Sequence, residues 1–353
     1  MDLTRQDYPW GQNSRKLGDV HMVTIKDVAK EAGVAISTVS NVLNNVDIVS
    51  DEKRQKVLAA AEKLKYVPNM NAKFLKSNKK NTIGLFLPSI QGDFYRMLMQ
   101  AIHMQCRLKG YLLNIYISNE NTSDEIYSMI ISSGVEGAIV LNEQLHDEYI
   151  DRIALTKMPI VFIDREYAGE NMSSVIINNT EGAILAMEYL IKQGHRRIGY
   201  IHGIDNYDDE ARYQAFTSTM AKYNLPIDET IMLRGYFEEA VAYSEMRVLL
   251  LKGTRMPDAF FCANDEMAWG CIRALTEGGY RVPEDVCVIG FDDILLSSYY
   301  TPALTTIHSP VIELGNTSAT ELFRLMDSEN DHKGRISKLT PSLVIRDTCI
   351  VRI

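Results

Sequence analysis

The sequence lacks the features of membrane-spanning and disulfide-stabilised proteins. Its longest apolar runs, such as 83–88 and 160–163, fall far short of the ~18–20 residues that a membrane-spanning helix needs. It has only five cysteines, an odd number with no CxxC pair, and most of them lie in apolar segments. We therefore expect reduced core cysteines in a cytoplasmic protein rather than a disulfide framework.

The common catalytic and nucleotide-binding motifs are missing as well. No GxGxxG or GxxxxGK[ST] follows a predicted strand, and GxSxG is absent. The seven histidines form no HxxxH pair, and no Ser-His-Asp or Cys-His arrangement stands out, so His195 and His202 are interpreted as structural. We predict that the chain is not an enzyme and uses neither a metal nor a cofactor.

Charge is distributed unevenly along the chain. The net charge of −9 argues against nucleic-acid binding by the chain as a whole. Residues 22–81, however, hold 11 Lys and Arg against 6 Asp and Glu, and residues 1–21 hold 3 of each sign, which leaves −14 for residues 82–353. A short basic segment on a large acidic body is typical of a nucleic-acid-binding head joined to a body with another task.

The basic segment predicts three short helices. Thr24 and Asp27 have the spacing of a capping box, and Gly33 then interrupts the helical pattern. A second helix is expected over 36–44, and Ser50 is expected to cap a third, whose apolar face combines Val57, Leu58, Ala61 and Leu64. Two short helices joined around a glycine fit a helix-turn-helix, while a generic three-helix bundle remains the alternative.

From residue 82 the chain alternates short apolar runs with amphipathic stretches. Strands are predicted at 82–87, 112–117, 137–141, 160–163, 174–177, 197–201, 231–233, 259–262, 287–291 and 304–308. Helices are predicted between them, among others at 94–109, 180–193, 208–223 and 265–277. Such alternation predicts α/β architecture with parallel sheets covered on both faces. About ten units are too many for one ordinary domain, so we expect two doubly wound parallel-sheet lobes.

These patterns predict a domain organisation. Residues 1–22 have neither a secretory signal pattern nor periodicity and are predicted to be a disordered extension or a remnant of cloning. The helix-turn-helix domain is assigned to 23–68, and a hinge helix with its linker to 69–81. The first lobe is assigned to 82–178 plus 310–335, and the second to 179–309 plus 336–353.

Particular residues of the head carry a family resemblance. The stretches 23–34, 37–40, 42–44 and 65–69, with Ala72 and Leu75, resemble the head of the LacI/GalR family of bacterial repressors, and the similarity continues to residue 353. The body is also similar to periplasmic sugar-binding proteins. The resemblance implies a helix-turn-helix whose second helix reads bases in the major groove, and a hinge helix that forms on operator DNA.

The resemblance also implies which residues contact DNA. Those matching the family's base- or phosphate-contacting positions are Thr24, Ala35, Ile36, Ser37, Thr38, Ser40, Asn41, Asn44, Ser50, Lys53, Asn69, Ala72, Lys73 and Leu75. Leu75 matches the leucine that wedges between base pairs in the minor groove. Two positions depart from the family, because Asn41 stands where an arginine is usual and Ala35 replaces a helix-capping serine. Several of these polar residues have helix capping or solvation as their alternative role.

Candidate ligand residues follow predicted strands of the body, where open α/β sheets bind ligands. Six of them are Phe94, Asp164, Arg165, Phe237, Asn264 and Asp292, and a seventh candidate, Arg212, matches the cleft arginine that the family resemblance implies. Carboxylates accept from hydroxyls, arginines donate in pairs, and an aromatic ring can cover the apolar face of a sugar, so this set suits a sugar or another polyol. The alternatives are that Asn264 only caps a helix, that Asp164 and Arg165 form a structural ion pair, and that both phenylalanines belong to the core.

The sequence therefore predicts a cytoplasmic, sequence-specific transcriptional regulator, most simply a repressor. Its expected partners are double-stranded operator DNA, a small sugar-like effector and a second copy of itself, with no membrane. No leucine heptads follow the strand-like segment at 342–345, so a homodimer is expected rather than a tetramer. The alternatives are a regulator controlled by a phosphorylated partner protein, and a sugar-binding protein or enzyme on the same core.

Overall fold

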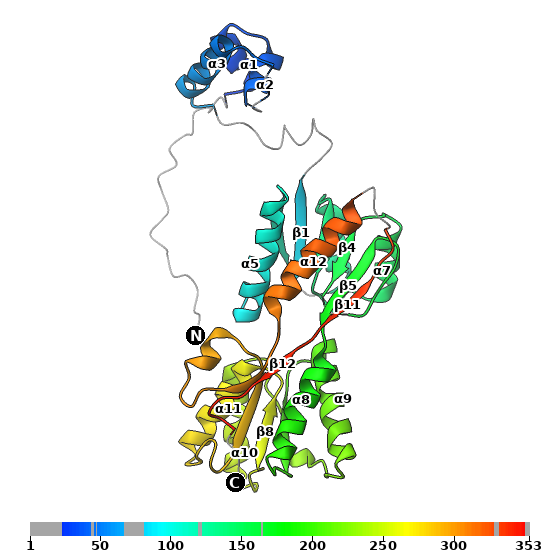
Figure 1. Ribbon diagram of the computed structural model, residues 1–353, viewed down its shortest axis with the longest axis vertical. Coiled ribbons are helices and arrows are strands. Elements are labelled where there is room, and N and C mark those ends of the chain that lie inside the picture. The colour runs from blue at the N-terminus through cyan, green and yellow to red at the C-terminus, as the bar shows by residue number, and fades with distance from the viewer. Residues whose placement is uncertain are drawn as a thin grey trace, which may run out of the picture. The chain divides into compact units, whose positions relative to one another are not determined.

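The computed structural model describes residues 23–43, 46, 48–66, 81–118, 122–163, 165–327 and 332–349. The chain divides into two compact units, Met1–Asn78 and Lys79–Ile353, which are considered separately below (Figure 1). The prediction for residues 1–22, and that of a hinge helix in 69–81 apart from Asn81, lie outside the described residues.

The head is a three-helix unit around a small apolar core. Its helices are α1 (Ile25–Ala32), α2 (Ile36–Leu43) and α3 (Asp51–Lys63). The Asp27 carboxylate accepts hydrogen bonds from both the backbone N–H and the hydroxyl of Thr24, which fixes the start of α1. Gly33 ends α1 with φ +64°, a left-handed conformation that glycine adopts without a side-chain penalty. The core consists of Val28, Ala29, Val39, Val42, Val57 and Ala60.

Of two expectations for α3, one is confirmed only in position and the other is wrong. Ser50 occupies the N-cap position, but its side chain makes no capping hydrogen bond. Leu58 is 51% exposed, because one residue beyond Val57 the helix has turned by ~100°, away from the core. Val57, Ala60, Ala61 and Leu64 repeat at helical spacing and form the inward stripe instead, with the last two only partly buried.

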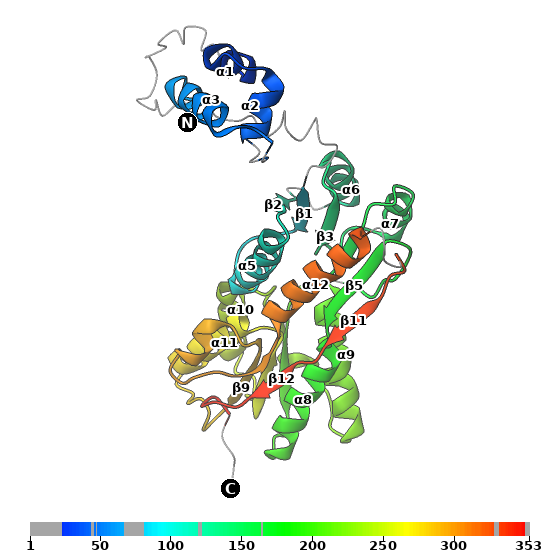
Figure 2. The ribbon, with the colours of Figure 1, turned by 45° about the horizontal axis from the view of Figure 1, so that its top comes forward.

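The first lobe of the body is built on a six-stranded parallel sheet. Its strand order is β11 (Ile336–Leu339), β5 (Met172–Ile177), β4 (Ile160–Phe162), β3 (Gly137–Val140), β1 (Thr82–Leu87) and β2 (Leu112–Ile117). Ile83, Leu85 and Leu87 pack beneath α5 (Asp93–Leu108) and α12 (Val311–Met326), which lie side by side in Figure 2. Phe86 points to the other face, where α6 (Ser123–Ser132) and α7 (Asp147–Ala154) pack. The alternation of side chains along β1 thus places helices on both faces.

The second lobe repeats this plan. Its sheet order is β12 (Ser342–Val344), β10 (Thr305–His308), β9 (Cys287–Asp292), β8 (Ala259–Cys262), β6 (Ile198–His202) and β7 (Met232–Arg234), with only β12 antiparallel to its neighbour. One face carries α8 (Asn179–Lys192) and α9 (Tyr207–Lys222), and the other carries α10 (Glu239–Leu251) and α11 (Asp265–Glu277). The prediction of two doubly wound lobes is confirmed.

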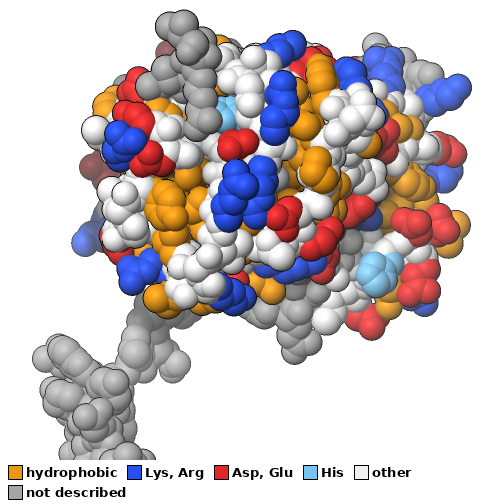
Figure 3. Space-filling model, turned by 90° about the horizontal axis from the view of Figure 1, so that it is seen from below, with side chains coloured by type: hydrophobic (Ala, Val, Ile, Leu, Met, Phe, Trp, Pro, Cys, Tyr) orange, Lys and Arg blue, Asp and Glu red, His pale blue; other side chains and the backbone are white. Residues whose placement is uncertain are grey.

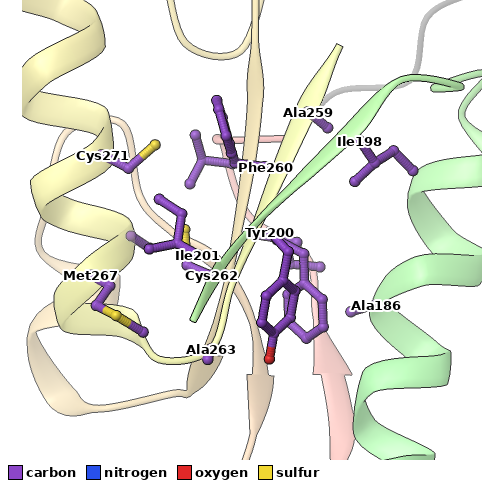
Figure 4. Packing of buried hydrophobic residues seen from close by; sticks show 14 of the residues in the cluster. Ala186, Ile198, Tyr200, Ile201, Ala259, Phe260, Cys262, Ala263, Met267 and Cys271 are labelled. Carbon is purple, nitrogen blue, oxygen red and sulfur yellow. The ribbon is translucent and has the colours of Figure 1, made fainter. Parts of the chain in front are cut away.

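The surface and the interior differ sharply in composition. On the face shown in Figure 3, basic and acidic side chains are interspersed with hydrophobic ones. In the second lobe's core, Tyr200 points toward α8 while the next residue of β6, Ile201, points toward α11 (Figure 4).

All five cysteines are buried and free. Within the described ranges, no helix is both long and apolar enough to cross a membrane.

The chain passes between the lobes three times. The crossings join β5 to α8, β10 to α12 and β11 to β12. The predicted assignment of all of 336–353 to the second lobe is wrong for its first residues, because β11 pairs with β5 in the first sheet and only β12 pairs in the second. The polar strand Ile336-Ser-Lys-Leu339, half-buried at an edge, gives too weak an apolar signal to be recognised from the sequence.

Candidate ligand cavity and nucleic-acid interface

A cavity of about 200 Å³ opens where the carboxyl ends of the strands of the two sheets face each other. The first lobe lines it with Pro88, Gln91, Gly92, Phe94, Tyr95, Leu141, Asn142, Glu143, Gln144, Ile163, Ile177 and Leu314. The second lobe contributes Ile204, Asp205, Asn206, Asp208, Arg212, Phe237, Asn264, Glu266, Asp292 and Ile294. Most of these residues directly follow a strand, which is the usual place for a ligand in an open α/β sheet.

Five of the seven predicted ligand residues line this cavity. They are Phe94, Arg212, Phe237, Asn264 and Asp292, which come from both lobes and from elements far apart in the sequence. Asp164 lies outside the described residues. Arg165 does not line the cavity. The two predicted structural histidines are also absent from its lining: His195 is completely buried, and Nδ1 of His202 lies 2.9 Å from a carboxylate oxygen of Asp209.

Arg212 is held rigidly in the wall of the cavity. It lies on the second turn of α9, is only 4% exposed, and donates from Nε to Oδ1 of Asn179 at 2.9 Å. Its Nη1 donates to the carbonyl of Ala263, and the guanidinium lies 3.8 Å from the centre of the Phe291 ring. Nη2 is 3.9 Å from Oδ1 of Asp292. The hydrogen bonds and the ring contact fix the guanidinium plane, so one edge is presented in a defined direction.

Asp292 faces Arg212 from the end of β9. Its φ is +113°, a conformation that non-glycine residues rarely adopt, and the hydroxyl of Ser309 donates to its carboxylate at 3.3 Å. Burial raises the pKa of Asp292 to about 7, against the lowering effect of Arg212. Strained backbone of this kind costs about 1–3 kcal/mol and clusters at binding sites.

Asn264 and Phe237 support each other. The side-chain oxygen of Asn264 accepts from the N–H of Met267 at 2.9 Å and caps α11, and its amide donates to the carbonyl of Phe237 at 3.2 Å. Asn264 is therefore both a helix cap and a lining residue. Phe237 has φ +63°, and a Cβ placed on Gly203 would come within 2.1 Å of its ring. Only glycine at 203 leaves room for this ring.

Arg165 has a different place from the one predicted. Its guanidinium donates to the carbonyls of Leu145 at 2.5 Å and Asn142 at 2.8 Å, and it lies over the ring of Phe162. It therefore holds the loop that follows β3, and this loop carries Glu143 into the cavity wall. We describe Arg165 as a positioning residue rather than a lining residue.

Several lining residues escaped the sequence reasoning. Tyr95, Glu143, Asp208 and Glu266 all line the cavity, and burial together with the charges of Asp208 and Glu143 raises the pKa of Tyr95 to about 12. For two of them, the position in the sequence indicates a place in the cavity wall. Asp208 stands one helical turn before Arg212, and Glu266 lies in the first turn of the helix that Asn264 caps. Glu143 depends on the path of a loop, which spacing alone does not predict.

In the head, α2 presents the predicted base-reading residues. Ile36 is 40% exposed, Ser37 is exposed, and Asn41 is half-buried on the same helix. Ala35 precedes the helix and accepts from the N–H groups of Thr38 and Val39 through its carbonyl, but its methyl group provides no side-chain cap. Thr24, Ser50 and Lys53 are exposed, while Thr38 and Ser40 are half-buried. The predicted residues outside the described part are Asn44, Asn69, Ala72, Lys73 and Leu75.

Comparisons with known sequences match both parts of the chain. The model of "Bacterial regulatory proteins, lacI family" matches residues 24–69, and that of "Periplasmic binding protein-like domain" matches residues 187–349. The HTH-type transcriptional repressor PurR of Pasteurella multocida (strain Pm70) is 36% identical over 332 residues, which cover 92% of this chain and 98% of the relative. PurR of Mannheimia succiniciproducens is 35% identical over 330 residues, with the same coverage of both chains.

Solved structures match over the same extent. The Lac repressor dimer bound to operator and the anti-inducer ONPF has a TM-score of 0.80 at 30% identity, covering 92% of this chain and 98% of its own. The complex of the transcriptional regulator CelR with cellobiose has a TM-score of 0.69 at 28% identity, covering 93% and 100%. A LacI family regulator from Enterococcus faecium with bound ribose has a TM-score of 0.68 at 26% identity, covering 77% and 100%.

Proposed function

The chain belongs to the LacI family of bacterial regulatory proteins, and from that membership we propose that it is a sequence-specific repressor of transcription whose operator binding is controlled by a sugar-like effector in the cavity between its lobes. It is a DNA-binding transcriptional regulator with a ligand-binding core. We propose that it has no catalytic role and that it acts in the cytoplasm, where operator DNA is accessible.

The observation that carries the effector proposal is the chemistry of the cavity wall. Arg212 and Asp292 offer a fixed donor next to a fixed acceptor, and Asn264 offers both kinds of group. Phe94 and Phe237 add apolar ring surface to the same cavity. Convergent polar groups with a ring surface suit a molecule that carries hydroxyls on one side and C–H groups on the other. Two related regulators have been solved with cellobiose and with ribose bound, which supports this class.

The operator proposal follows from α2. Asn41 pairs one donor and one acceptor with adenine N6 and N7, whereas arginine would contact guanine N7 and O6. Ile36 adds only apolar contact, for example to a thymine methyl group. We expect a pseudopalindromic operator whose half-sites carry adenine where those of relatives have guanine. From the family resemblance, Leu75 wedges a flexible pyrimidine–purine step at the centre.

Two recognition helices are needed for two half-sites, so the acting form is a homodimer. The related Lac repressor structure is described as a dimer bound to operator, which supports this assembly. Sedimentation of the full chain is expected to give a dimer. A stable tetramer would contradict the assembly proposed here.

The function is tested by selecting binding sites from random duplex DNA with the full chain. The selected operator is then challenged with sugars, polyols and nucleosides while its release or retention is followed by fluorescence anisotropy. We expect sequence-specific binding and a change of at least about tenfold in operator affinity with one small molecule, within the 1–3 kcal/mol typical of allosteric coupling. Absence of any selected sequence would refute the DNA-binding proposal. If operator binding changes only when a phosphorylated protein is added, the proposal of a small-molecule effector is refuted.

A further inference from the structure

The cavity wall carries far more negative than positive charge. Five acidic side chains line it: Glu143, Asp205, Asp208, Glu266 and Asp292. Among the described lining residues, Arg212 is the only lysine or arginine. On the one face that Figure 3 shows, both signs are interspersed, whereas the described lining of the cavity carries five acidic side chains and one arginine.

The guanidinium of Arg212 already interacts with other groups of the cavity wall. Two of its nitrogens donate to Asn179 and to the carbonyl of Ala263, and Nη2 lies within about 4 Å of both Asp292 and Asp208. The guanidinium therefore offsets part of the charge of these two carboxylates. An anionic ligand would have to share it with them and would also meet the negative charge of the other carboxylates of the wall.

The other acidic residues of the wall differ in the groups that face their negative charge. Asp205 is largely exposed at the rim and pairs with Arg234 at 2.8 Å. Glu143 accepts an N–H bond from Tyr207 at 3.0 Å, which is a neutral donor. In the described part of the chain, nothing donates a hydrogen bond to the half-buried Glu266. Its Oε1 lies 3.1 Å from the position that a Cβ on Gly92 would take, so the carboxylate reaches across the cavity toward the first lobe.

Carboxylates in the cavity wall and just outside it act on one another through their charges. The charges of Asp93, Glu239 and Glu238 raise the pKa of Glu266, after burial as the main cause, and the charge of Glu266 in turn helps to raise the pKa of Asp292. Among the described residues, no lysine or arginine forms an ion pair with Glu266, while Asp93 is paired with Arg96 and Glu239 with Arg273. A cation bound in the cavity near Glu266 would therefore stabilise the charged form of this carboxylate.

We propose, building on the function proposed above, that the effector is an amine-bearing sugar whose ammonium group binds to Glu266, and that phosphorylated and carboxylated sugars are rejected. The hydroxyls of such a ligand suit Arg212, Asn264 and Asp292, as for a neutral sugar. The ammonium group supplies the charge that the wall lacks. A charge-assisted hydrogen bond of this kind corresponds to a gain in affinity of about 10- to 150-fold.

Matched ligand series test the proposal on the full-length protein. D-Glucosamine, D-galactosamine and D-mannosamine are each compared with the parent sugar, its N-acetyl derivative and its 6-phosphate by calorimetric titration and by shifts in melting temperature. We expect at least one amine to bind about tenfold or more tightly than its parent and N-acetyl forms, with no response to the corresponding phosphate. The same ligands are then tested for release of the selected operator.

Two charge-removing variants locate the effect. Glu266→Gln keeps the size of the side chain and is expected to abolish the preference for the amine. Glu238→Gln removes a charge from the same neighbourhood but from an exposed residue outside the cavity lining, and is expected to keep the preference.

Three outcomes would overturn the proposal. They are an amine preference that survives Glu266→Gln, a phosphate that binds as well as its amine, and no response to any amine at millimolar concentration. A neutral sugar that releases operator without an amine preference would leave the proposed function standing. Loss of operator binding itself would instead refute that function.

Discussion

Replacing Arg212 with methionine tests the cavity most directly. Methionine keeps an unbranched chain of similar length but removes the guanidinium, which is only 4% exposed. If an effector bonds to the free edge of this group, the lost charged hydrogen bond is worth about 1.5–3 kcal/mol, or a 10- to 150-fold fall in affinity. The response of the operator complex to the effector is expected to disappear at ligand concentrations that saturate the unmodified protein.

The same change has a calculable effect on stability. The side-chain oxygen of Asn179 and the carbonyl of Ala263 lose their donor, and Asp292 loses the cation 3.9 Å from its carboxylate. The pKa of Asp292, already raised to about 7 by burial, is expected to rise further, so that the carboxyl group takes up a proton at neutral pH rather than remaining a buried charge. This relaxation keeps the loss of unfolding free energy within about 2–5 kcal/mol. A body of this size is expected to remain folded.

The assay pairs effector titration with operator binding and thermal unfolding. Arg281→Met is the matched control, since Arg281 is 70% exposed, pairs only locally with Asp285, and is not a lining residue. We expect the control to respond normally to the effector. The reasoning is refuted if Arg212→Met also responds normally, and a variant that melts normally but no longer binds operator would assign Arg212 a role in the DNA-bound state instead.

Three further substitutions test separate parts of the structure. Arg165→Met removes two hydrogen bonds to the loop after β3 and is expected to lower the free energy of unfolding by about 1–3 kcal/mol and weaken effector binding; an unchanged melting curve would contradict the positioning role. Asn41→Arg is expected to shift operator selection from adenine toward guanine by ~1–3 kcal/mol, and a guanine preference that exists without it and survives Asn41→Ala would refute the proposed pairing. Burial raises the pKa of Asp265 from 3.8 to about 8, so the folded protein keeps a proton that the unfolded chain releases, and this residue's contribution to stability falls as pH rises from about 4 to 8. The free energy of unfolding of Asp265→Asn relative to the unmodified protein is expected to increase by about 1.4 kcal/mol per pH unit in that range, and a pH-independent difference would refute the assignment.

The fold was predictable wherever a single local signal was strong. Strands β1, β2 and β8 were predicted with the bounds they have, because each is a compact run of apolar or β-branched residues. Strand β11 was missed, since its residues alternate between exposed and half-buried at a sheet edge and its parallel pairing with β5 joins segments about 160 residues apart. Long-range pairing of that kind leaves no local trace in the sequence.

The cavity was predictable in its strand-end positions but not in its loops. Asn264 and Asp292 lie at or just after strand ends, where position along the chain implies position in space, whereas Arg212, on the second turn of α9, was implied by the family resemblance. Arg165 also follows a strand, yet its guanidinium is used by the carbonyls of Asn142 and Leu145. Which way a side chain turns after a strand depends on the backbone groups that surround it, and these become known only with the structure.

Helix α9 connects the two lobes to the cavity wall. At its first residue, the backbone N–H of Tyr207 donates to Glu143 at 3.0 Å and its hydroxyl donates to Glu166 at 2.9 Å, and both acceptors belong to the first lobe. Glu166 is fixed in turn by Lys338 of β11 at 2.7 Å. Little more than a turn further along, the same helix carries Arg212, which holds Asp292 and Asn179 of the second lobe.

A relative movement of the lobes therefore acts on both ends of one rigid segment. A shift of the first lobe has one of two results. Either Glu143 and Glu166 keep their hydrogen bonds to Tyr207 and pull α9 along, which displaces Arg212, or these hydrogen bonds break. A ligand that bonds to both Glu143 and Arg212 would favour the arrangement in which the Tyr207 bonds are intact, because only that arrangement offers both groups at a fixed distance. This gives the effector a physical means of selecting one arrangement of the lobes, which is the requirement for control of an operator-binding head joined to the first strand of the first lobe.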